Sequence, residues 1–263
     1  MRGILTEIDD KKPTVKKNIE IENQSVESQE NVICTLIETN INEIIHYYHR
    51  AAKKSAVYYI LKRVLDIIIG SALLFIMMPF LILIAFLIKL ESRGPVVIKQ
   101  HRVGRNRRLG LRSNGHLVER RKHDLKGQLI TIYKFRTMYD GVNMYADSPS
   151  NTNDPRITRV GKFIRSLCLD ELPQIINIIR GDISLVGPRP EMPYIVRNYN
   201  EIQSLRLIVK PGLTGLWQIK APRDKHIHEY IHFDLDYILF QSTIFDMKLI
   251  FKTIYFICHC KNI

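Results

Sequence analysis

The chain carries one long apolar stretch, residues 67–88, in which no side chain is charged. Asp66 and Lys89 bound it, and as a helix it is long enough to reach across a hydrocarbon core of about 30 Å. Pro79, preceded by Met78, lies near its middle. Because a proline removes one backbone hydrogen bond and clashes with the preceding turn, the pattern predicts a helix that kinks or breaks at Pro79.

Positive charges flank this stretch on both sides. They are Lys53, Lys54, Lys62 and Arg63 before it, and Lys89, Arg93, Lys99, Arg102, Arg105, Arg107 and Arg108 after it. Because positive residues favour the cytosolic side, both ends are drawn there. A helix that enters and leaves through one leaflet satisfies both ends if its freed backbone groups find local partners, whereas a straight span does not. From the pattern alone this re-entrant form and an ordinary transmembrane anchor are equally supported. A buried core helix is disfavoured, because no face of the stretch is polar.

The pattern divides the rest of the chain into three parts. Residues 1–30 are polar and poor in aromatic residues, which predicts a disordered tail. Residues 31–61 place isoleucines and a leucine at helical spacing, which predicts an amphipathic extension that packs on the protein or lies on lipid. With the re-entrant segment taken as residues 62–90, residues 91–263 remain for a cytosolic domain.

Within residues 91–263, short strand-like runs alternate with helices, which is typical of a mixed, helix-rich α/β domain. We expect strands at 95–99 and 129–135, and helices at 158–166, 170–180, 227–239 and 244–258. The run 105–126 is crowded with arginine and lysine and predicts an exposed basic insertion. The last helix carries Lys248 and Lys252 beside an apolar side, so it either rests in a membrane interface or packs on the core.

The charge of the chain indicates the kind of partner it binds, and its cysteines indicate the cellular compartment. Lys and Arg outnumber Asp and Glu by 39 to 26, and the net charge of +13 indicates a polyanionic partner: nucleic acid, an acidic membrane surface or a phosphorylated substrate. The four cysteines lack zinc-type spacing, which predicts reduced cytosolic thiols. The polar start shows no signal peptide, so we expect a cytosolic N-terminus. His226, His228 and His232 do not share one helix face, which disfavours a metal site.

Two adjacent carboxylates, Asp170 and Glu171, precede a turn that contains Pro188 and Arg189. An aspartate can attack phosphorus, a neighbouring glutamate can hold a divalent cation, and an arginine can bind phosphate oxygens, so the cluster indicates phosphoryl transfer. We expect Asp170 to cap the helix that follows, where helix amides would lower its pKa and bind anions. The simpler interpretation is a solvated helix start and a surface turn.

Seven motifs occur in one order along residues 58–257. They are Lys62-Arg63-x-x-Asp66; Gly94-Pro95 with Gln100-x-Arg102-Val103-Gly104; Tyr133-Lys134-Phe135-Arg136-Thr137-Met138; Arg156-Ile157-Thr158-Arg159-Val160-Gly161; Leu169-Asp170-Glu171-Leu172-Pro173-Gln174; Gly181-Asp182-x-Ser184-Leu185-Val186-Gly187-Pro188-Arg189-Pro190; and Pro211-Gly212-Leu213-Thr214-Gly215. Together they resemble the bacterial sugar transferases, the polyprenyl-phosphate hexose-1-phosphate transferases that begin capsule, exopolysaccharide, O-antigen and glycan assembly.

The resemblance implies a monotopic phosphoglycosyl transferase. Such an enzyme has a re-entrant membrane helix broken at Pro79, interfacial amphipathic helices and a catalytic domain on the cytoplasmic face of the bacterial inner membrane. Its reaction moves a sugar-1-phosphate from a UDP-sugar to undecaprenyl phosphate and releases UMP. Mg²⁺ is the implied cofactor, membrane lipid is a further partner, and a homodimer is left open.

The resemblance also assigns roles to particular residues. Asp170 matches the nucleophile that forms a phosphosugar–enzyme intermediate, and Glu171 matches the residue that positions Mg²⁺. Further substrate-binding positions are Arg165, Arg189, Pro188, Arg223, Asp236, Lys134 and Arg136, and Lys62 and Arg63 are grouped with the Met78–Pro79 break as features of the membrane segment. The sequence departs from the family pattern at Met78, where many relatives have serine, and at Pro222, where relatives usually have glycine.

Two other functions compete with this interpretation. A membrane-anchored nucleic-acid-binding protein would use the positive charge on a phosphate backbone, but the basic insertion 105–126 contains no aromatic residue for base stacking. We therefore expect no nucleic-acid partner. An inactive membrane scaffold with the transferase fold is the other alternative, and the intact Asp170, Glu171, Arg165 and Arg189 argue against it.

Overall fold

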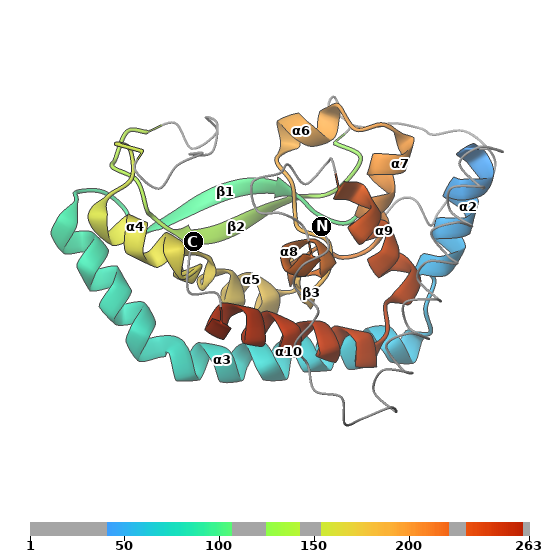
Figure 1. Cartoon of the computed structure of the whole chain (residues 1–263), viewed down its shortest axis with the longest axis horizontal. Coiled ribbons are helices and arrows are strands. Elements are labelled where there is room, and N and C mark those ends of the chain that lie inside the picture. The colour runs from blue at the N-terminus through green and yellow to red at the C-terminus, as the bar shows by residue number, and fades with distance from the viewer. Residues whose placement is uncertain (1–40, 107–124, 143–153, 221–229, 260–263) are drawn as a thin grey trace, which may run out of the picture. The chain divides into compact units, whose positions relative to one another are not determined.

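The computed structural model describes residues 41–106, 125–142, 154–220 and 230–259 (Figure 1). The chain divides into two compact units, residues 1–47 and 48–263, and the architecture below is that of the second. Helix α2 (Ile41–Ala52) crosses the boundary, and α3 begins at Ala56. The described part of the predicted extension therefore forms two helices and not one. The predicted tail at 1–30 lies outside the described residues.

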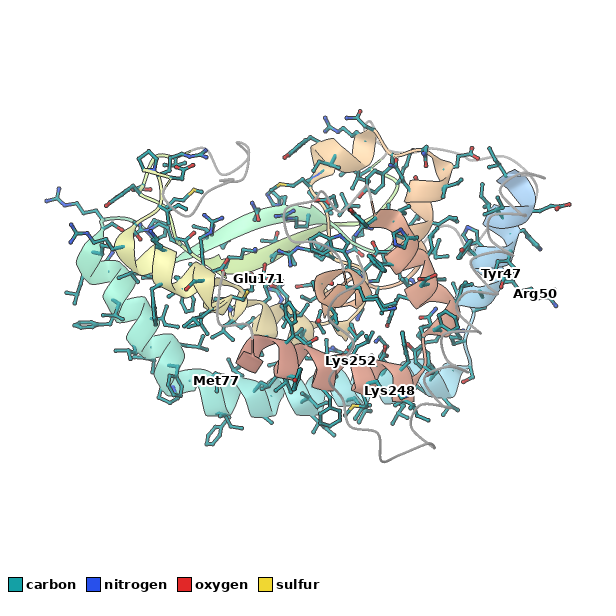
Figure 2. The ribbon with its side chains drawn as sticks, in the orientation of Figure 1. Tyr47, Arg50, Met77, Glu171, Lys248 and Lys252 are labelled. Atoms are coloured by element: carbon teal, nitrogen blue, oxygen red, sulfur yellow. The ribbon has the colours of Figure 1, made fainter. Side chains whose placement is uncertain are left out.

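Helix α3 (Ala56–Glu91) contains the whole apolar stretch. Ser55 caps its N-terminus by accepting a hydrogen bond from the amide of Tyr58 at 3.2 Å. The helix bends near its middle, where Met77 is labelled beside the bend (Figure 2), and Pro79 lies two residues further on. The predicted kink is thus confirmed, but the helix continues through it, so a complete break is wrong for this structure.

The middle of α3 contains no buried residue. The buried residues of the helix are Tyr58, Asp66, Gly70, Ile84 and Ile88, so none lies between residues 71 and 83. In the described part of the chain, α3 is the one helix that is long and apolar enough to cross a membrane, judged by length and composition. An apolar surface left this exposed indicates a membrane-associated segment, because water disfavours it.

Two basic side chains on α3 attach the helix to the domain. Lys62 donates a hydrogen bond to the Asp246 carboxylate at 2.6 Å, from the neighbouring helix α10 (Thr243–His259). Arg63 donates to the carbonyls of Ile178 and Ile179 at 2.7 and 2.6 Å, at the C-terminal end of α5 (Gln174–Arg180). The two residues that the resemblance groups with the break therefore join the membrane helix to the domain, well before the bend.

The next polar residue of α3 makes a third attachment. Asp66 is 3% exposed, and one of its carboxylate oxygens accepts hydrogen bonds from the Ser184 hydroxyl and the Leu185 amide, both at 2.9 Å. Ser184 and Leu185 belong to β3 (Ser184–Val186), which pairs in parallel with β4 (Gly212–Thr214). The Lys-Arg-x-x-Asp motif is thus a three-point attachment of α3.

An antiparallel hairpin forms the larger of the two described sheets. Strand β1 (Val97–Val103) pairs with β2 (Leu129–Phe135) from Val97 opposite Phe135 to Val103 opposite Leu129. The second strand matches its predicted bounds, whereas the first continues beyond the predicted 95–99. The insertion predicted at 105–126 connects the two strands, and its residues 107–124 lie outside the described part.

The segment before α5 differs from prediction. Helix α4 (Arg159–Ser166) is capped by Thr158, as its predicted start requires, and Cys168 then adopts a left-handed conformation with φ of 55°. A 3₁₀ turn, η1 (Leu169–Glu171), follows, and the α-helix begins only at Gln174. The amides of Glu171 and Leu172 donate to carbonyls three residues earlier, those of Cys168 and Leu169, so the chain forms a 3₁₀ turn at Asp170 and not the start of an α-helix. The prediction that Asp170 caps a helix is therefore wrong.

Short helices surround these elements and complete a helix-rich α/β domain, as predicted. They are α6 (Pro193–Arg197), α7 (Glu201–Ser204), η2 (Leu205–Ile208), α8 (Leu216–Lys220) and α9 (Ile231–Phe240). Helix α9 begins later than the predicted 227, and residues 227–229 lie outside the described part. One core cluster joins the end of α3 to the domain through Ile84, Ile88, Phe135 and Ile164.

Candidate active site

A cavity of about 670 Å³ lies along the β1–β2 hairpin and reaches η1 and the end of α4. Its charged lining residues are Lys99, Arg102, Lys134, Arg136, Arg156 and Arg165, against the two acids Asp140 and Asp170. A concave site with this excess of cations attracts a polyanion. Asp170, Arg165, Lys134 and Arg136 were all predicted from sequence, and the structure brings these four together.

Asp170 lies at the cavity surface on η1, with its side chain 17% exposed. Its nearest cation is Lys134, whose Nζ lies 3.9 Å from a carboxylate oxygen. Burial raises the pKa of Asp170, although Lys134, Arg165 and Arg189 oppose that shift. The predicted lowering of this pKa by helix amides is wrong, because Asp170 does not stand at a helix N-terminus.

Glu171, which is labelled in Figure 2 and lies three residues before α5 begins, is held between two cations. Lys134 donates a hydrogen bond to it at 2.8 Å, and Arg189 donates two, at 2.6 and 3.3 Å. Burial disfavours the charged form, yet Arg189 and Lys134 hold the pKa of Glu171 well below its usual range. Lys134 therefore links the two carboxylates: it forms a hydrogen bond with Glu171 and stays close to Asp170.

Arg165 occupies the last turn of α4 and lines the cavity. Its Nη1 is buried and has no hydrogen-bond partner among the described residues. A buried donor without a partner is costly, so a ligand with acceptor oxygens would be stabilised there. This unsatisfied guanidinium nitrogen is the feature of the cavity that best suits an anionic ligand.

Arg136 also lines the cavity but is largely occupied elsewhere. It donates hydrogen bonds to the Ser92 carbonyl, the Ser92 hydroxyl and the Arg93 carbonyl, at 2.8, 2.9 and 2.6 Å. It thereby fixes the chain just after α3. In the same region Glu91 accepts hydrogen bonds from the first amides of α4, so both residues join the end of the membrane helix to the cavity wall.

The turn containing Pro188 and Arg189 lies behind Glu171. Pro188 is buried, and its carbonyl accepts a hydrogen bond from the Gly212 amide at 2.9 Å. The Arg189 carbonyl accepts one from Arg206 at 2.8 Å, and Arg206 pairs with Asp234 at 2.7 Å. Neither Pro188 nor Arg189 lines the large cavity, so in this structure the turn supports Glu171 from behind.

The remaining predicted positions lie apart from the cavity. Asp236 is half-buried on α9 and does not line it, whereas the neighbouring Asp234 is buried against Arg206. Arg223 lies outside the described residues, and so does the departure at Pro222. Met78 and Pro79 are exposed on α3.

Sequence reasoning gave Arg102 and Gln100 no role at the site, although both line the cavity. Arg102 donates a hydrogen bond to the Gln100 side chain at 2.8 Å and pairs with Glu191 at 3.5 Å. Burial, together with the nearby Arg189, lowers the pKa of Arg102. Both residues belong to the Gln100-x-Arg102-Val103-Gly104 motif, so that motif was the signal that could have found them.

The carboxylates near the cavity are the groups that could hold the implied Mg²⁺. The described residues contain no cluster of three or more histidine, cysteine, aspartate or glutamate side chains that could hold a metal ion. Mg²⁺ commonly binds one or two carboxylates together with substrate phosphates, and Asp170 and Glu171 offer such a pair. The two side chains are thus of the donor type that Mg²⁺ takes together with a phosphorylated substrate, but Glu171 does not line the cavity and its carboxylate is bonded to Lys134 and Arg189.

These features define a class: a membrane-associated α/β domain that carries a cavity lined mainly by cations, with a carboxylate on its wall. The chain belongs to the bacterial sugar transferase family, whose model matches residues 57–260, and the resemblance drawn from the motifs is thus confirmed.

Similarity to individual curated proteins supports the same family. The chain is 36% identical over 209 residues to the UDP-glucose:undecaprenyl-phosphate glucose-1-phosphate transferase of Escherichia coli, covering 76% of this chain and 41% of that protein. It is 35% identical over 197 residues to the exopolysaccharide production protein ExoY of Rhizobium meliloti, covering 75% and 85%. It is 32% identical over 225 residues to the undecaprenyl-phosphate galactose phosphotransferase of Salmonella typhimurium, covering 80% and 42%. The chain thus spans well under half the length of the first and third of these.

Proposed function

We propose that this protein is a phosphoglycosyl transferase that moves a sugar-1-phosphate from a UDP-sugar to undecaprenyl phosphate and releases UMP. The observation that carries the proposal is the pairing, in one cavity, of the Asp170 carboxylate with the buried, unpartnered Nη1 of Arg165. The names of the relatives, a UDP-glucose:undecaprenyl-phosphate glucose-1-phosphate transferase and an undecaprenyl-phosphate galactose phosphotransferase, support this acceptor and this class of donor. Family membership supports a role in polysaccharide or glycan assembly.

In the first step, a carboxylate oxygen of Asp170 attacks the β-phosphorus of the UDP-sugar. A new oxygen–phosphorus bond forms on Asp170, the bond from the β-phosphorus to the bridging oxygen breaks, and UMP leaves with the electron pair. In the second step, an oxygen of undecaprenyl phosphate attacks the same phosphorus. The bond to Asp170 then breaks, which restores the carboxylate and yields the lipid diphosphate sugar.

The cationic residues of the cavity would assist this reaction by offsetting the negative charge of the diphosphate. Asp170 needs no general base once it is ionised, but its target carries negative charge that would repel it. Lys134 and Arg165, with Arg102 nearby, would bind the phosphate oxygens and reduce that repulsion. Glu171 would hold Mg²⁺, which when bound neutralises diphosphate charge. In the absence of substrate, Lys134 and Arg189 balance the charge of Glu171.

The bent α3 would enter and leave the cytoplasmic leaflet of the inner membrane. Three observations support this placement: the bend near Met77, the absence of buried residues in the middle of α3, and the positive charges on both flanks. Cysteines placed at Lys53 and Arg93 in a cysteine-free background would test it. Both should react with an impermeant maleimide in inverted vesicles and neither in intact cells, and opposite accessibility would indicate a straight span.

The reaction is tested by UMP release from a panel of UDP-sugars, using protein solubilised in detergent, with and without undecaprenyl phosphate and Mg²⁺. Lipid- and metal-dependent release from one donor, lost in Asp170→Asn, would establish both the reaction and the donor. Without the lipid acceptor, the intact mass of the wild type should rise by one phosphosugar, and that of Asp170→Asn should not. No release and no adduct with any donor would instead indicate a scaffold.

A further inference from the structure

A second cavity, of about 250 Å³, lies against the first turns of α3. Its lining residues are Tyr59, Lys62, Arg63, Asp66, Arg105, Val209, Lys210, Tyr237 and Gln241, and it shares none of them with the large cavity. Four of its residues are cationic and one is anionic. The motif Lys62-Arg63-x-x-Asp66 forms one wall, and the first residue of the basic insertion contributes to another.

The wall formed by α3 is fixed by contacts within the protein. Lys62 is neutralised by Asp246 at 2.6 Å, and Arg63 binds two carbonyls of α5. Asp66 accepts hydrogen bonds from β3. These side chains therefore keep their positions whether or not a ligand is present, and they contribute a preorganised positive field.

The other two cations are available to a ligand. Lys210 makes no hydrogen bond and no ion pair with the described part of the chain. Arg105 donates through Nε to the Ile208 carbonyl at 3.0 Å and lies over the Tyr59 ring at 5.8 Å. Its two terminal nitrogens bond to none of the described residues, so both side chains present unused donors to the cavity.

The charges around Lys210 favour the binding of an anion. Burial and the neighbouring Arg63, Lys62 and Arg105 lower the pKa of Lys210, and Asp66 offsets them only in part. A bound anion would relieve the repulsion among these cations. The cavity is smaller than the roughly 300 Å³ at which pockets for drug-sized ligands begin, so it suits a head group better than a nucleotide sugar.

The cavity also lies close to an apolar surface. Tyr59, Lys62, Arg63 and Asp66 follow helical spacing along one face of α3. A different face of the same turns exposes Val57 and Ile60, which are 71% and 64% exposed, together with Leu61 and Val64. If α3 lies in lipid, the phosphates of the membrane surface would be within reach of the cavity.

We propose that this second cavity binds a phosphate group, held by Lys210 and Arg105 against the fixed wall of α3. Two sources share that chemistry: the head group of an anionic phospholipid, and a soluble phosphate monoester. Both would be bound by charge-assisted hydrogen bonds. The site is separate from the one that would bind the UDP-sugar.

The test uses the full-length protein in a mild non-ionic detergent. Native mass spectrometry measures binding of phosphatidylglycerol and phosphatidylcholine, and a thermal shift measures binding of inorganic phosphate and glycerol phosphate. The variants are Lys210→Gln and Arg105→Gln. Lys210→Arg keeps the charge, and Lys252→Gln removes a charge from α10, where Lys248 and Lys252 lie one turn apart (Figure 2). Far-ultraviolet circular dichroism and elution volume check that each variant is folded.

We expect at least one anionic probe to bind the wild type, with an affinity about ten-fold or more above that of Lys210→Gln and Arg105→Gln. Lys210→Arg and Lys252→Gln should bind like the wild type. Preference for phosphatidylglycerol identifies a lipid head group, and binding of the soluble probes alone identifies a soluble phosphate. Unchanged binding in Lys210→Gln and Arg105→Gln would overturn the proposal, as would an equal loss in Lys252→Gln. Since binding is measured without UDP-sugar, failure of the proposed transferase reaction would leave this result unaffected.

Discussion

The guanidinium of Arg189 donates two hydrogen bonds to the carboxylate of Glu171, at 2.6 and 3.3 Å. Lys134 donates a hydrogen bond to the same carboxylate at 2.8 Å and also lies near Asp170. Glu171 therefore fixes the position of Lys134 in the cavity, while Arg189 fixes the position of Glu171. An acidic residue expected only to bind metal thus also organises the positive charge beside Asp170.

Glu171→Gln should therefore have two effects. It removes the anion between Lys134 and Arg189, and we expect a loss of about 2 kcal/mol in the free energy of unfolding. We also expect kcat/KM for UMP release to fall about 100-fold and its dependence on Mg²⁺ to weaken. A magnesium titration and thermal unfolding in detergent measure these effects.

Glu201→Gln is the matched control for that experiment, because it removes an exposed glutamate at the start of α7. It should leave both the metal dependence and the stability within error of the wild type. Full activity and unchanged metal dependence in Glu171→Gln would remove Glu171 from the proposed mechanism.

The raised pKa of Asp170 predicts a pH effect on the reaction. The nucleophile must be ionised, and burial keeps the carboxyl protonated to a higher pH than an ordinary aspartate of about 3.9. As pH falls through the raised pKa, the ionised Asp170 carboxylate is lost. The midpoint of the acid limb of kcat/KM should therefore lie above the pKa of an ordinary aspartate. Lys134→Gln should move the limb further up, because Lys134 favours the charged form.

The pH profile separates this role of Lys134 from a merely structural one. A change that only loosens the fold lowers the plateau without moving the midpoint of the acid limb. A midpoint that stays in place in Lys134→Gln, or that moves down, would contradict the assignment. Lys162→Gln, on the exposed side of α4, controls for the loss of a lysine.

The buried pair Arg206 and Asp234 should show strong coupling. Their side chains approach to 2.7 Å and are 1% and 2% exposed, and Arg206 also donates to the Arg189 carbonyl. Arg206→Met leaves the buried Asp234 without its partner at 2.7 Å, and Asp234→Leu leaves Arg206 only the longer ion pair with Glu191 at 4.0 Å, so we expect each to cost about 3–5 kcal/mol, with the smaller loss for Asp234→Leu. The double variant should recover part of that loss, since it leaves neither charge, and a thermal-unfolding cycle measures the coupling. Strictly additive losses would show that the contact is not an energetic pair.

Local patterns explain which elements could be predicted. The strand at 129–135 was predicted with its correct bounds, because its apolar and β-branched residues form a continuous strand-like run. The first strand was predicted too short, since its second half contains Gln100, His101 and Arg102. Those polar residues do not favour a strand by propensity, and two of them line the cavity. Local preference was thus overridden at a candidate functional site.

Long-range contacts explain what the sequence could not supply. The resemblance predicted Asp170, Arg165 and Lys134 as site residues, and the structure places all three in one cavity. The roles of Arg63 and Arg136, however, depend on backbone carbonyls more than 40 residues away, which no local pattern contains. The unpartnered Nη1 of Arg165 is likewise a property of packing alone.

The attachment of α3 through Asp66 gives a sharp test by two related substitutions. One oxygen of Asp66 accepts both hydrogen bonds from β3, so an amide oxygen in Asp66→Asn can still accept both while the charge is lost. Asp66→Ala removes the acceptor and leaves the buried Ser184 hydroxyl and Leu185 amide unsatisfied. We expect a loss of about 3 kcal/mol for alanine and about 1 kcal/mol for asparagine. Thermal unfolding measures this order, and limited proteolysis between α3 and the hairpin should be faster in Asp66→Ala. Equal stability of Asp66→Ala and the wild type would mean that α3 is held to the domain mainly by Lys62, Arg63 and apolar packing.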